Sequence, residues 1–258
     1  MARPEIVYLT CPMPVAMGDP WFEIAVPDHF WMVRRFDVLR RLAAEVLARG
    51  GCLAEIGCGN GVLQVQLEEH LRLPVDGFDL NERALQMSIA KHSSRFCYNI
   101  LERRAELFEK YDVIFLFDIV EHIADEDSFL ESVLHHLAPG GCLVVNVPAL
   151  PSLFSAYDRA AGHVRRYTVH SLVSLAAHHR LTVERITYWG LPMVPLLFIR
   201  KFLLGLRARS EHQTLHQGFK PPSAGWNRIL GLLARLEPLP QTLLGSSVMA
   251  VIRKPASP

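Results

Sequence analysis

The chain has 258 residues, and its 27 basic and 26 acidic side chains leave a formal charge of +1. This length suffices for one large α/β domain with a full hydrophobic core. The near-neutral balance gives no electrostatic reason to expect nucleic acid as a partner, because such binding calls for a clustered basic face. The start, MARPEIVYLT, lacks the positive and apolar regions of a secretory signal. The most apolar span, 189–206, is interrupted by Arg200 and Lys201 and does not predict a transmembrane helix.

Taken in chain order, apolar stretches alternate with amphipathic ones. A helix is predicted first, over 29–50, and strands and helices then follow one another. Strands are predicted at 52–58, 75–80, 94–100, 111–118, 142–149, 181–189 and 246–254, with helices at 61–71, 81–92, 125–137 and 168–180 between them. Apolar strands that alternate with helices are typical of βαβ units. The fold class is therefore α/β, with a mostly parallel sheet covered on both faces.

We expect one domain over 1–258, in four parts. The parts are an N-terminal helical lid at 1–49, a core sheet at 50–190, a helical insertion at 191–243, and the last strand with its tail at 244–258. The insertion is too long for a plain connection between two strands. It contains two apolar-rich helical stretches, 196–210 and 226–239, separated by a polar, proline-bearing segment.

The cysteines indicate a reducing compartment. None belongs to a CxxC pair, an odd one is left over, and three lie in stretches typical of buried strands. Unpaired core thiols suit a soluble, cytoplasmic protein better than a disulfide-stabilised secreted one. The five are Cys11, Cys52, Cys58, Cys97 and Cys142.

The twelve histidines do not predict a metal site. His135–His136 and His178–His179 are adjacent pairs, not i, i+4 pairs, and no carboxylate or cysteine cluster accompanies them. We interpret them as surface-facing helix residues, and no metal is expected.

The stretch AEIGCGNG predicts a ligand-binding turn after the first core strand. It places Glu55, Gly57, Gly59 and Gly61 where that strand passes into a helix. Glycines there allow a sharp turn and a close approach of the backbone to a ligand. Asp79 ends the second strand, where a carboxylate can accept hydrogen bonds from both hydroxyls of an adenosine ribose.

The spacing of these glycines separates two classes of ligand. Dinucleotide sites use GxGxxG, whereas here the third glycine comes one residue early and Val62 follows it. The acid at Glu55 would also oppose an anionic pyrophosphate, but it could balance the cationic sulfonium and amino group of S-adenosylmethionine. The pattern therefore favours S-adenosylmethionine over a nicotinamide dinucleotide.

These motifs resemble those of the class I S-adenosylmethionine-dependent methyltransferases. LAEIGCGNG is similar to the first motif of that family and GFDLN to its acidic loop, and the run from Tyr111 to Ala149 resembles its fourth and fifth strands. The DIVEH version is similar to the branch that includes quinone-biosynthesis and small-molecule O-methyltransferases. HFWMVRR and YDRAAGHVRRYT resemble a subgroup of this branch that is associated with glycan, lipid or natural-product pathways.

The resemblance implies a Rossmann-like sheet of seven strands in the order 3-2-1-4-5-7-6, with the last strand antiparallel. It also implies that Glu55, Gly57 and Gly59 surround the methionine part of the cofactor and that Asp79 binds its ribose. Asn99 and Ile100 stand where the family commonly has an acid or polar residue near the adenine. This departure bears on which residues contact the adenine, and not on the identity of the cofactor. The cofactor-binding set predicted in this way is Glu55, Gly57, Cys58, Gly59, Asp79, Leu80, Asn99, Ile100, Asp118 and Ile119.

The end of the fourth strand brings Asp118, Glu121 and His122 to the same edge of the sheet. His122 can be either a catalytic group or a packed, hydrogen-bonded histidine. Asp118 can be a residue that caps a helix or a loop. The resemblance places this segment along the methionine part of the cofactor, so we expect it to have a supporting role.

The segment YDRAAGHVRRYT, 157–168, emerges after the fifth strand at that edge and concentrates polar side chains. His163 is the preferred general base, with Asp158 to orient it, because a positioned histidine can contribute roughly 10²–10⁴-fold to proton transfer. Together with His122 these form the predicted catalytic set. Arg165 and Arg166 could bind a carboxylate or phosphate. The alternative is that these arginines lock the loop through ion pairs to Asp158 or Glu121.

Substrate contacts are predicted from two places. Trp31 and Arg34 on the first helix are candidates for a lid, and Tyr157, Arg165, Arg166 and Tyr167 for the wall of the active site. The insertion places basic residues beside apolar ones, so peripheral contact of 191–243 with an anionic membrane is an alternative to packing against the domain or a dimer partner.

The sequence thus predicts a methyltransferase that moves a methyl group from S-adenosylmethionine to a small-molecule acceptor, most readily at oxygen, by in-line displacement. The alternatives are transfer to nitrogen, or to a lipid, quinone or glycan-linked acceptor at a membrane surface. Outside this class stand a nicotinamide-dependent oxidoreductase and a non-catalytic cofactor-binding protein. The acceptor is not named by the sequence, and the chain could act as a monomer or a homodimer.

Overall fold

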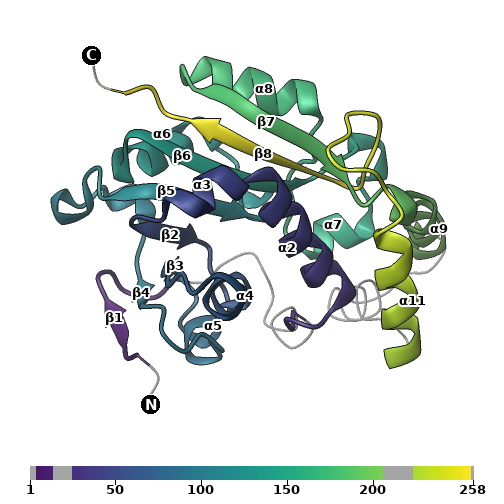
Figure 1. Cartoon of the computed structure of the whole chain (residues 1–258), viewed down its shortest axis with the longest axis horizontal. Coiled ribbons are helices and arrows are strands. Elements are labelled where there is room, and N and C mark those ends of the chain that lie inside the picture. Colours follow the sequence, from purple (N-terminus) through teal and green to yellow (C-terminus); the bar gives the residue numbers. More distant parts are fainter. Residues whose placement is uncertain (1–3, 14–24, 206–222, 257–258) are drawn as a thin grey trace.

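One mixed sheet organises the chain (Figure 1). The computed structural model describes residues 4–13, 25–205 and 223–256. Its strands lie in the order β1-β4-β3-β2-β5-β6-β8-β7, and only β8 runs antiparallel to its neighbours. The strands are β1 (Ile6–Tyr8), β2 (Leu53–Ile56), β3 (Asp76–Asp79), β4 (Arg95–Cys97), β5 (Tyr111–Phe117), β6 (Leu137–Pro148), β7 (Thr182–Trp189) and β8 (Ser247–Arg253).

The predicted order is confirmed from β4 to β7, but the predicted number of strands is wrong. An eighth strand, β1, pairs in parallel with β4 at the edge of the sheet, where Val7 lies opposite Phe96. A strand of three residues is too short to show a period in the sequence. It covers backbone groups of β4 that would otherwise form an open edge.

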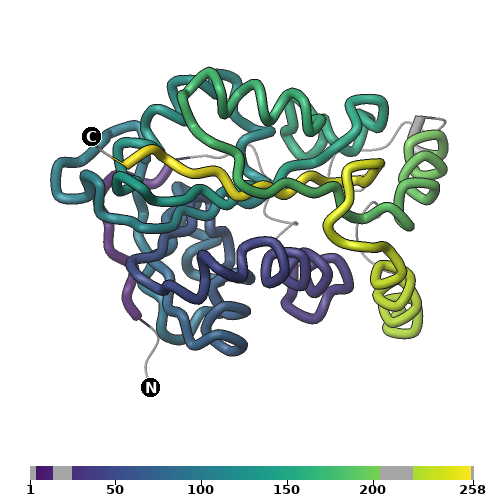
Figure 2. Tube along the Cα trace, turned by 45° about the horizontal axis from the view of Figure 1, so that its top comes forward, coloured from purple at the N-terminus to yellow at the C-terminus, as the bar shows by residue number. Residues whose placement is uncertain are grey.

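Helices cover both faces of the sheet (Figures 1 and 2). Ile114 and Leu116 of β5 pack in the core on the side of α6 and α8, while Val113, Phe115 and Phe117 pack on the side of α2, α3 and α4. The alternation follows from the two-residue period of a strand. The α-helices are α2 (Phe30–Leu42), α3 (Ala44–Arg49), α4 (Val62–Leu71), α5 (Glu82–Gln86), α6 (Glu126–His136), α7 (Ala156–Ala160), α8 (Val169–His178), α9 (Val194–Gly205) and α11 (Ala224–Ala234).

Helix α5 is shorter than predicted. Asn81 caps it, as expected, by accepting a hydrogen bond from the backbone N–H of Ala84 at 3.2 Å. The helix nevertheless ends at Gln86 and not at residue 92. The backbone N–H groups of Lys91, His92 and Ser93 instead donate to the carboxylate of Glu68 on α4, which draws this segment out of helical geometry.

Helices α2 and α11 lie side by side, and a buried ion pair holds them together with the segment that follows β7. Arg34 on α2 donates to Glu237 at 3.0 Å, and both side chains are almost fully buried. Glu237 also accepts from the backbone N–H groups of Gly190 and Leu191. Helix α11 and the segment after it therefore pack on the N-terminal helix, whereas α9 packs against α7. No helix within the described ranges is long and apolar enough to cross a membrane.

Candidate active site

A cavity of about 320 Å³ lies at the carboxyl ends of β2, β3, β4 and β5. In an open α/β sheet this is the edge at which ligands bind. All ten residues of the predicted cofactor-binding set line the cavity: Glu55, Gly57, Cys58, Gly59, Asp79, Leu80, Asn99, Ile100, Asp118 and Ile119. The sequence did not predict several further lining residues, among them Met32, Arg35, Tyr98 and Phe117.

The glycine loop is held against β3 by its backbone. The N–H of Gly57 donates to the carbonyl of Phe78 at 2.8 Å, and Gly57 has a left-handed φ of +74°. A Cβ at this position would collide with Cδ1 of Ile119, which also lines the cavity. Glycine is therefore required here for both its backbone conformation and its lack of a side chain.

Asp79 is held in place by two backbone donors. Its Oδ2 accepts from the N–H of Gly59 and its Oδ1 from the N–H of Asn81, each at 2.8 Å. Burial raises the pKa of the Asp79 carboxyl, and the backbone hydrogen bonds oppose that rise. Because an ionised carboxylate offers about four acceptor positions, each oxygen can still accept a hydrogen bond from a ligand hydroxyl.

Glu55 is a buried acid on the cavity wall. It is 4% exposed, and its Oε2 has no hydrogen-bond partner among the residues that the structure describes. Burial raises the pKa of Glu55 to about 8; Arg35 opposes this rise, and Asp79 and Asp118 add to it. A cation in the cavity would stabilise the ionised form of Glu55, whereas an anion would oppose it. The wall thus favours a cationic ligand.

Asp118 is the centre of a buried polar network. Its carboxylate accepts from Nη1 of Arg35 at 2.6 Å and from Nδ2 of Asn146 at 2.7 Å. Asn146 in turn accepts from the indole N–H of Trp189 at 2.9 Å. The network joins α2 to the ends of β5, β6 and β7. The adjacent pair Arg34–Arg35 was visible in the sequence, but nothing in it indicated that Arg35, and not Arg34, would reach the cavity.

Asn99 and Ile100 line the cavity just after the end of β4. Ile100 is buried, and Oδ1 of Asn99 accepts from the backbone N–H of Leu101 at 3.1 Å. This bond caps the short 3-10 helix η1 (Ile100–Glu102) and occupies one acceptor position of the Asn99 amide. The apolar side chains here offer a surface for a flat ring.

In the segment 157–168, Asp158 and Arg166 form a buried ion pair that holds the segment in place. Asp158 accepts from Nε of Arg166 at 2.6 Å, from Nδ1 of His163 at 3.1 Å, and from the backbone and hydroxyl of Ser155. These donors hold the pKa of the Asp158 carboxyl well below its usual range, against the effect of burial. Arg166 also donates to the carbonyl of Ala149. The expected ion pair between Arg166 and Asp158 is therefore present.

The other predicted substrate-binding residues of this segment are also engaged within the protein. Arg165 pairs with Glu126 at 2.6 Å, and not with Glu121, while the hydroxyl of Tyr167 donates to the same Glu126. The ring of Tyr157 lies under the guanidinium of Arg200 at 4.1 Å. None of these side chains lines the cavity. The structure supports the locking interpretation of Arg165, Arg166 and Tyr167, and it gives no support to their substrate role.

The first helix contributes different residues from those predicted. Trp31 packs against Trp189 with ring centroids 4.4 Å apart, and Arg34 forms the buried pair with Glu237. Neither lines the cavity, whereas Met32 and Arg35 do. Helix α2 thus forms part of the wall, whereas Trp31 packs on Trp189 and Arg34 pairs with Glu237.

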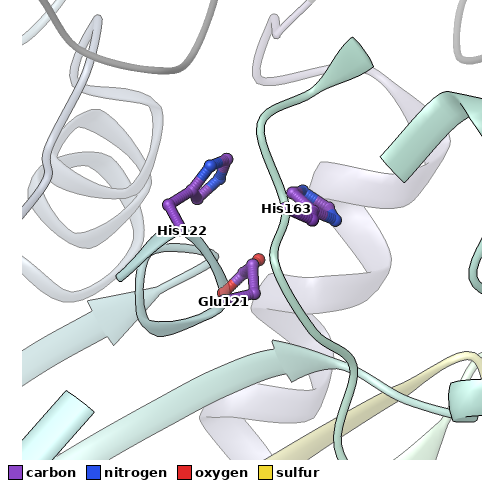
Figure 3. A group of neighbouring side chains, drawn as sticks. All are labelled: Glu121, His122 and His163. Carbon is purple, nitrogen blue, oxygen red and sulfur yellow. The ribbon is translucent and has the colours of Figure 1, made fainter. Parts of the chain in front are cut away.

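Of the predicted catalytic set, only His122 lines the cavity. His163 lies behind it, with the two rings edge to face and their centroids 4.7 Å apart (Figure 3). Burial and the neighbouring His163 lower the pKa of His122 to about 3, so its imidazole is neutral at pH 7. Burial also raises the pKa of Glu121 well above its usual value, with Asp118 adding to the rise.

A glycine loop and an acid at the ends of adjacent parallel strands, around a cavity at the switch point of the sheet, define a nucleoside-binding α/β enzyme. Residues 29–186 match the family described as "Methyltransferase domain", and the chain belongs to that family. This confirms the predicted class, the class I methyltransferases, whose methyl donor is S-adenosylmethionine.

Curated relatives match a part of the chain. The ubiquinone biosynthesis O-methyltransferase of Sinorhizobium medicae is 34% identical over 50% of this chain and 59% of its own length. The enzyme of the same description from a Caulobacter species is 31% identical over 49% of this chain and 56% of its own length. The chain therefore spans less than two thirds of the length of these relatives.

Solved structures share the fold at low sequence identity. A SAM-dependent methyltransferase from Archaeoglobus fulgidus aligns with a TM-score of 0.53 at 17% identity, over 87% of this chain and 94% of its own. A structure described as a [4+2]-cyclase aligns with a TM-score of 0.55 at 12% identity, over 96% of this chain and 99% of its own. Since the two carry different descriptions, the fold alone does not define the reaction.

The cavity wall yields a prediction at Gly57. Gly57→Ala should lower the affinity for S-adenosylhomocysteine by about tenfold or more, because the added methyl group pushes Ile119 into the cavity. It should also lower the free energy of unfolding by the ~1–2 kcal/mol of a left-handed alanine plus an overpacking cost of ~1–3 kcal/mol. Calorimetric titration and urea denaturation measure the two effects.

Gly140→Ala is the matched control, since Gly140 has a φ of +75° and a Cβ there would meet no atom within 4 Å. Gly140→Ala should lower the free energy of unfolding by the cost of a left-handed alanine alone. It should bind the nucleoside as the wild type does. Unchanged nucleoside binding by Gly57→Ala would mean that this part of the cavity does not hold the ligand.

Proposed function

We propose that the chain transfers a methyl group from S-adenosylmethionine to an oxygen atom of a small-molecule acceptor. The observation that carries the proposal is the pairing of Glu55 and Asp79 across a glycine loop in one cavity. When bound, S-adenosylmethionine supplies a methyl group already activated by its sulfonium. The tasks that remain for the protein are to bind, to exclude water and to align the acceptor.

The residues present suit this cofactor in two ways. Glu55 is a buried acid with an oxygen that lacks a partner, and a cationic ligand compensates such a group. A Cβ at Gly57 would push against Ile119, which also lines the cavity, so glycine keeps this part of the wall open. Asp79 would hold the ribose, Glu55 would face the charged methionine end, and Ile100 would contact the base. A dinucleotide, by contrast, would bring a pyrophosphate against the acidic wall.

Among the predicted catalytic residues, only His122 could assist proton transfer from the cavity wall, since neither Asp158 nor His163 lines the cavity. A neutral imidazole can accept a proton, but the low pKa of His122 makes it a weak base. The main contribution of the chain is therefore positioning. The similarity to O-methyltransferases of ubiquinone biosynthesis supports oxygen as the acceptor atom and keeps a quinone-like or lipid acceptor as the second candidate.

The surface of the insertion favours this second candidate. Helices α9 and α11 lie at the same end of the molecule (Figure 2) and expose large apolar side chains, including Phe202 at 68% and Leu232 at 65%. Their sequences contain no acid; Lys201 and Arg228 are basic, and the third base, Arg200, lies over the ring of Tyr157. Apolar side chains accompanied only by basic ones suit an anionic lipid surface. Docking there would give the active site access to a membrane-held acceptor.

Binding of the donor class is tested by calorimetric titration with S-adenosylhomocysteine and, separately, with NAD. We expect the wild type to bind the nucleoside and not NAD. Asp79→Asn should weaken nucleoside binding about 100-fold (~3 kcal/mol), because two hydrogen bonds to a charged acceptor are lost or weakened. Asp76→Asn, at the other end of β3, is the matched control and should bind normally. Preferential binding of NAD would contradict the methyltransferase proposal.

Membrane contact is tested by cosedimentation with phosphatidylglycerol vesicles at low salt. The wild type should bind them and should bind phosphatidylcholine vesicles more weakly. Phe202→Ser should reduce the partition coefficient about tenfold, since burial of one aromatic side chain contributes ~1.5–3 kcal/mol. Phe108→Ser, at an exposed aromatic residue in another part of the chain, should not. Failure of the wild type to bind anionic vesicles would remove this candidate.

A further inference from the structure

Strand β7 forms one edge of the sheet (Figure 1). Among the residues that the structure describes, β8 is the only strand that pairs with it. The segment after α11 covers the last part of its outer side, where the backbone N–H of Tyr188 donates to the carbonyl of Gln241 at 2.9 Å. Backbone groups along a sheet edge can pair with a further strand. The preceding six residues of β7, 182–187, are called the open edge below.

The sequence of the open edge, TVERIT, is complementary to itself. When two copies run antiparallel about a two-fold axis between Glu184 and Arg185, these two residues lie opposite each other. Val183 then lies opposite Ile186, and the threonines at the two ends lie opposite one another. Each pair matches in type: acid with base, β-branched apolar with β-branched apolar, and hydroxyl with hydroxyl. Cross-strand pairs of these kinds stabilise a sheet, whereas like charges in opposite positions destabilise it.

A bulge in β7 makes this pairing geometrically feasible. In a regular strand, residues three apart point to opposite faces, so Val183 and Ile186 would not meet across a two-fold axis. The register on β8 shifts between Val183 and Arg185, which adds one residue to β7. Val183 and Ile186 accordingly pack against the same core cluster, on the side of α6 and α8. Because the N–H of Tyr188 points away from β8, alternation and the bulge give Ile186 and Val183 the same outward direction.

The two charged residues of the open edge stay accessible. Glu184 pairs with Arg253 on β8, and Arg185 pairs with Glu45 on α3. Their side chains nevertheless remain 33% and 47% exposed. Charges and bulges on an edge discourage pairing with arbitrary strands. Here they select one partner, since a matching strand needs the same bulge and the reverse order of charges, and β7 of a second copy has both.

The surroundings of the open edge leave room for a second strand. A groove of about 490 Å³ runs along it on the side of α2, lined by residues of that helix, by 184–187 and by 239–240. Side chains of an incoming strand can enter this groove. The cavity of the candidate active site lies at the ends of β2 to β5, and β6 and β8 separate it from β7. Pairing at β7 therefore leaves the cavity of each copy open.

We propose that two copies of the chain form a symmetric dimer by antiparallel pairing of their open edges, with Glu184 of each copy opposite Arg185 of the other. Such a contact is isologous and closes after two copies, so it does not lead to fibres. The letters TVERIT were visible in the sequence, but their self-complementarity depends on the bulge and on the edge position, which only the fold supplies. Because the paired segment is short, we expect a reversible dimer with a dissociation constant of about 10 µM.

Sedimentation velocity of the full-length chain, at about 1–100 µM, tests the dimer. The wild type should pass from monomer to dimer over this range. Glu184→Arg and Arg185→Glu each place like charges opposite one another and should raise the dissociation constant at least about tenfold. An equimolar mixture of the two variants should restore the dimer, because one then has two bases and the other two acids at the facing positions. A merely local loss of stability would not be reversed by mixing.

Glu69→Arg is the matched control, since Glu69 is an exposed acid that pairs with Lys91 away from β7, and this variant should dimerise as the wild type does. Circular dichroism establishes that each variant is folded. The chain with both Glu184→Arg and Arg185→Glu restores opposite charges, should dimerise normally, and decides the matter if a single variant is not folded. A wild type that stays monomeric up to about 100 µM overturns the proposal. So do single variants that dimerise like the wild type, or a mixture that stays monomeric.

Discussion

The buried network around Asp118 determines the shape of the site. The Asp118 carboxylate meets the guanidinium of Arg35 from α2 and the amide of Asn146 from β6, and Asn146 meets the indole of Trp189 from β7. Buried charges are tolerated only when they are paired and hydrogen-bonded, so each member restricts the others to one arrangement. The N-terminal helix is thereby attached to the edge of the sheet at which the cavity opens. Without this attachment, α2 could not complete the wall.

The cofactor half of the site could be predicted because its determinants are local. A parallel sheet brings the ends of neighbouring strands to one edge, so Glu55, Gly57 and Asp79 had to converge once the strands were recognised. The strand order followed from the family resemblance. The short β1 (Ile6–Tyr8) could not be predicted, because three residues show no period. Helix α5 ends early through contacts with Glu68, which is distant in the sequence.

The acceptor half could not be predicted in the same way. Polar residues near a catalytic edge can face a substrate or one another, and their types do not reveal which. Arg34, Arg165 and Arg166 form ion pairs within the protein, whereas Arg35 reaches the cavity. The choice depends on acids such as Glu237, which lies about two hundred residues from Arg34. The donor site is thus built from a local sequence pattern, whereas the roles of these arginines depend on ion pairs that form only in the folded chain.

A crystal structure of the chain grown with S-adenosylhomocysteine would show what the cavity holds. We expect the ribose hydroxyls at Asp79, the amino acid end toward Glu55, and the base beside Ile100, with Gly57 against the ligand. A nucleoside bound elsewhere, or a cavity closed by Ile119 and Met32 in a crystal that contains the ligand, would contradict the assignment of this cavity to the methyl donor.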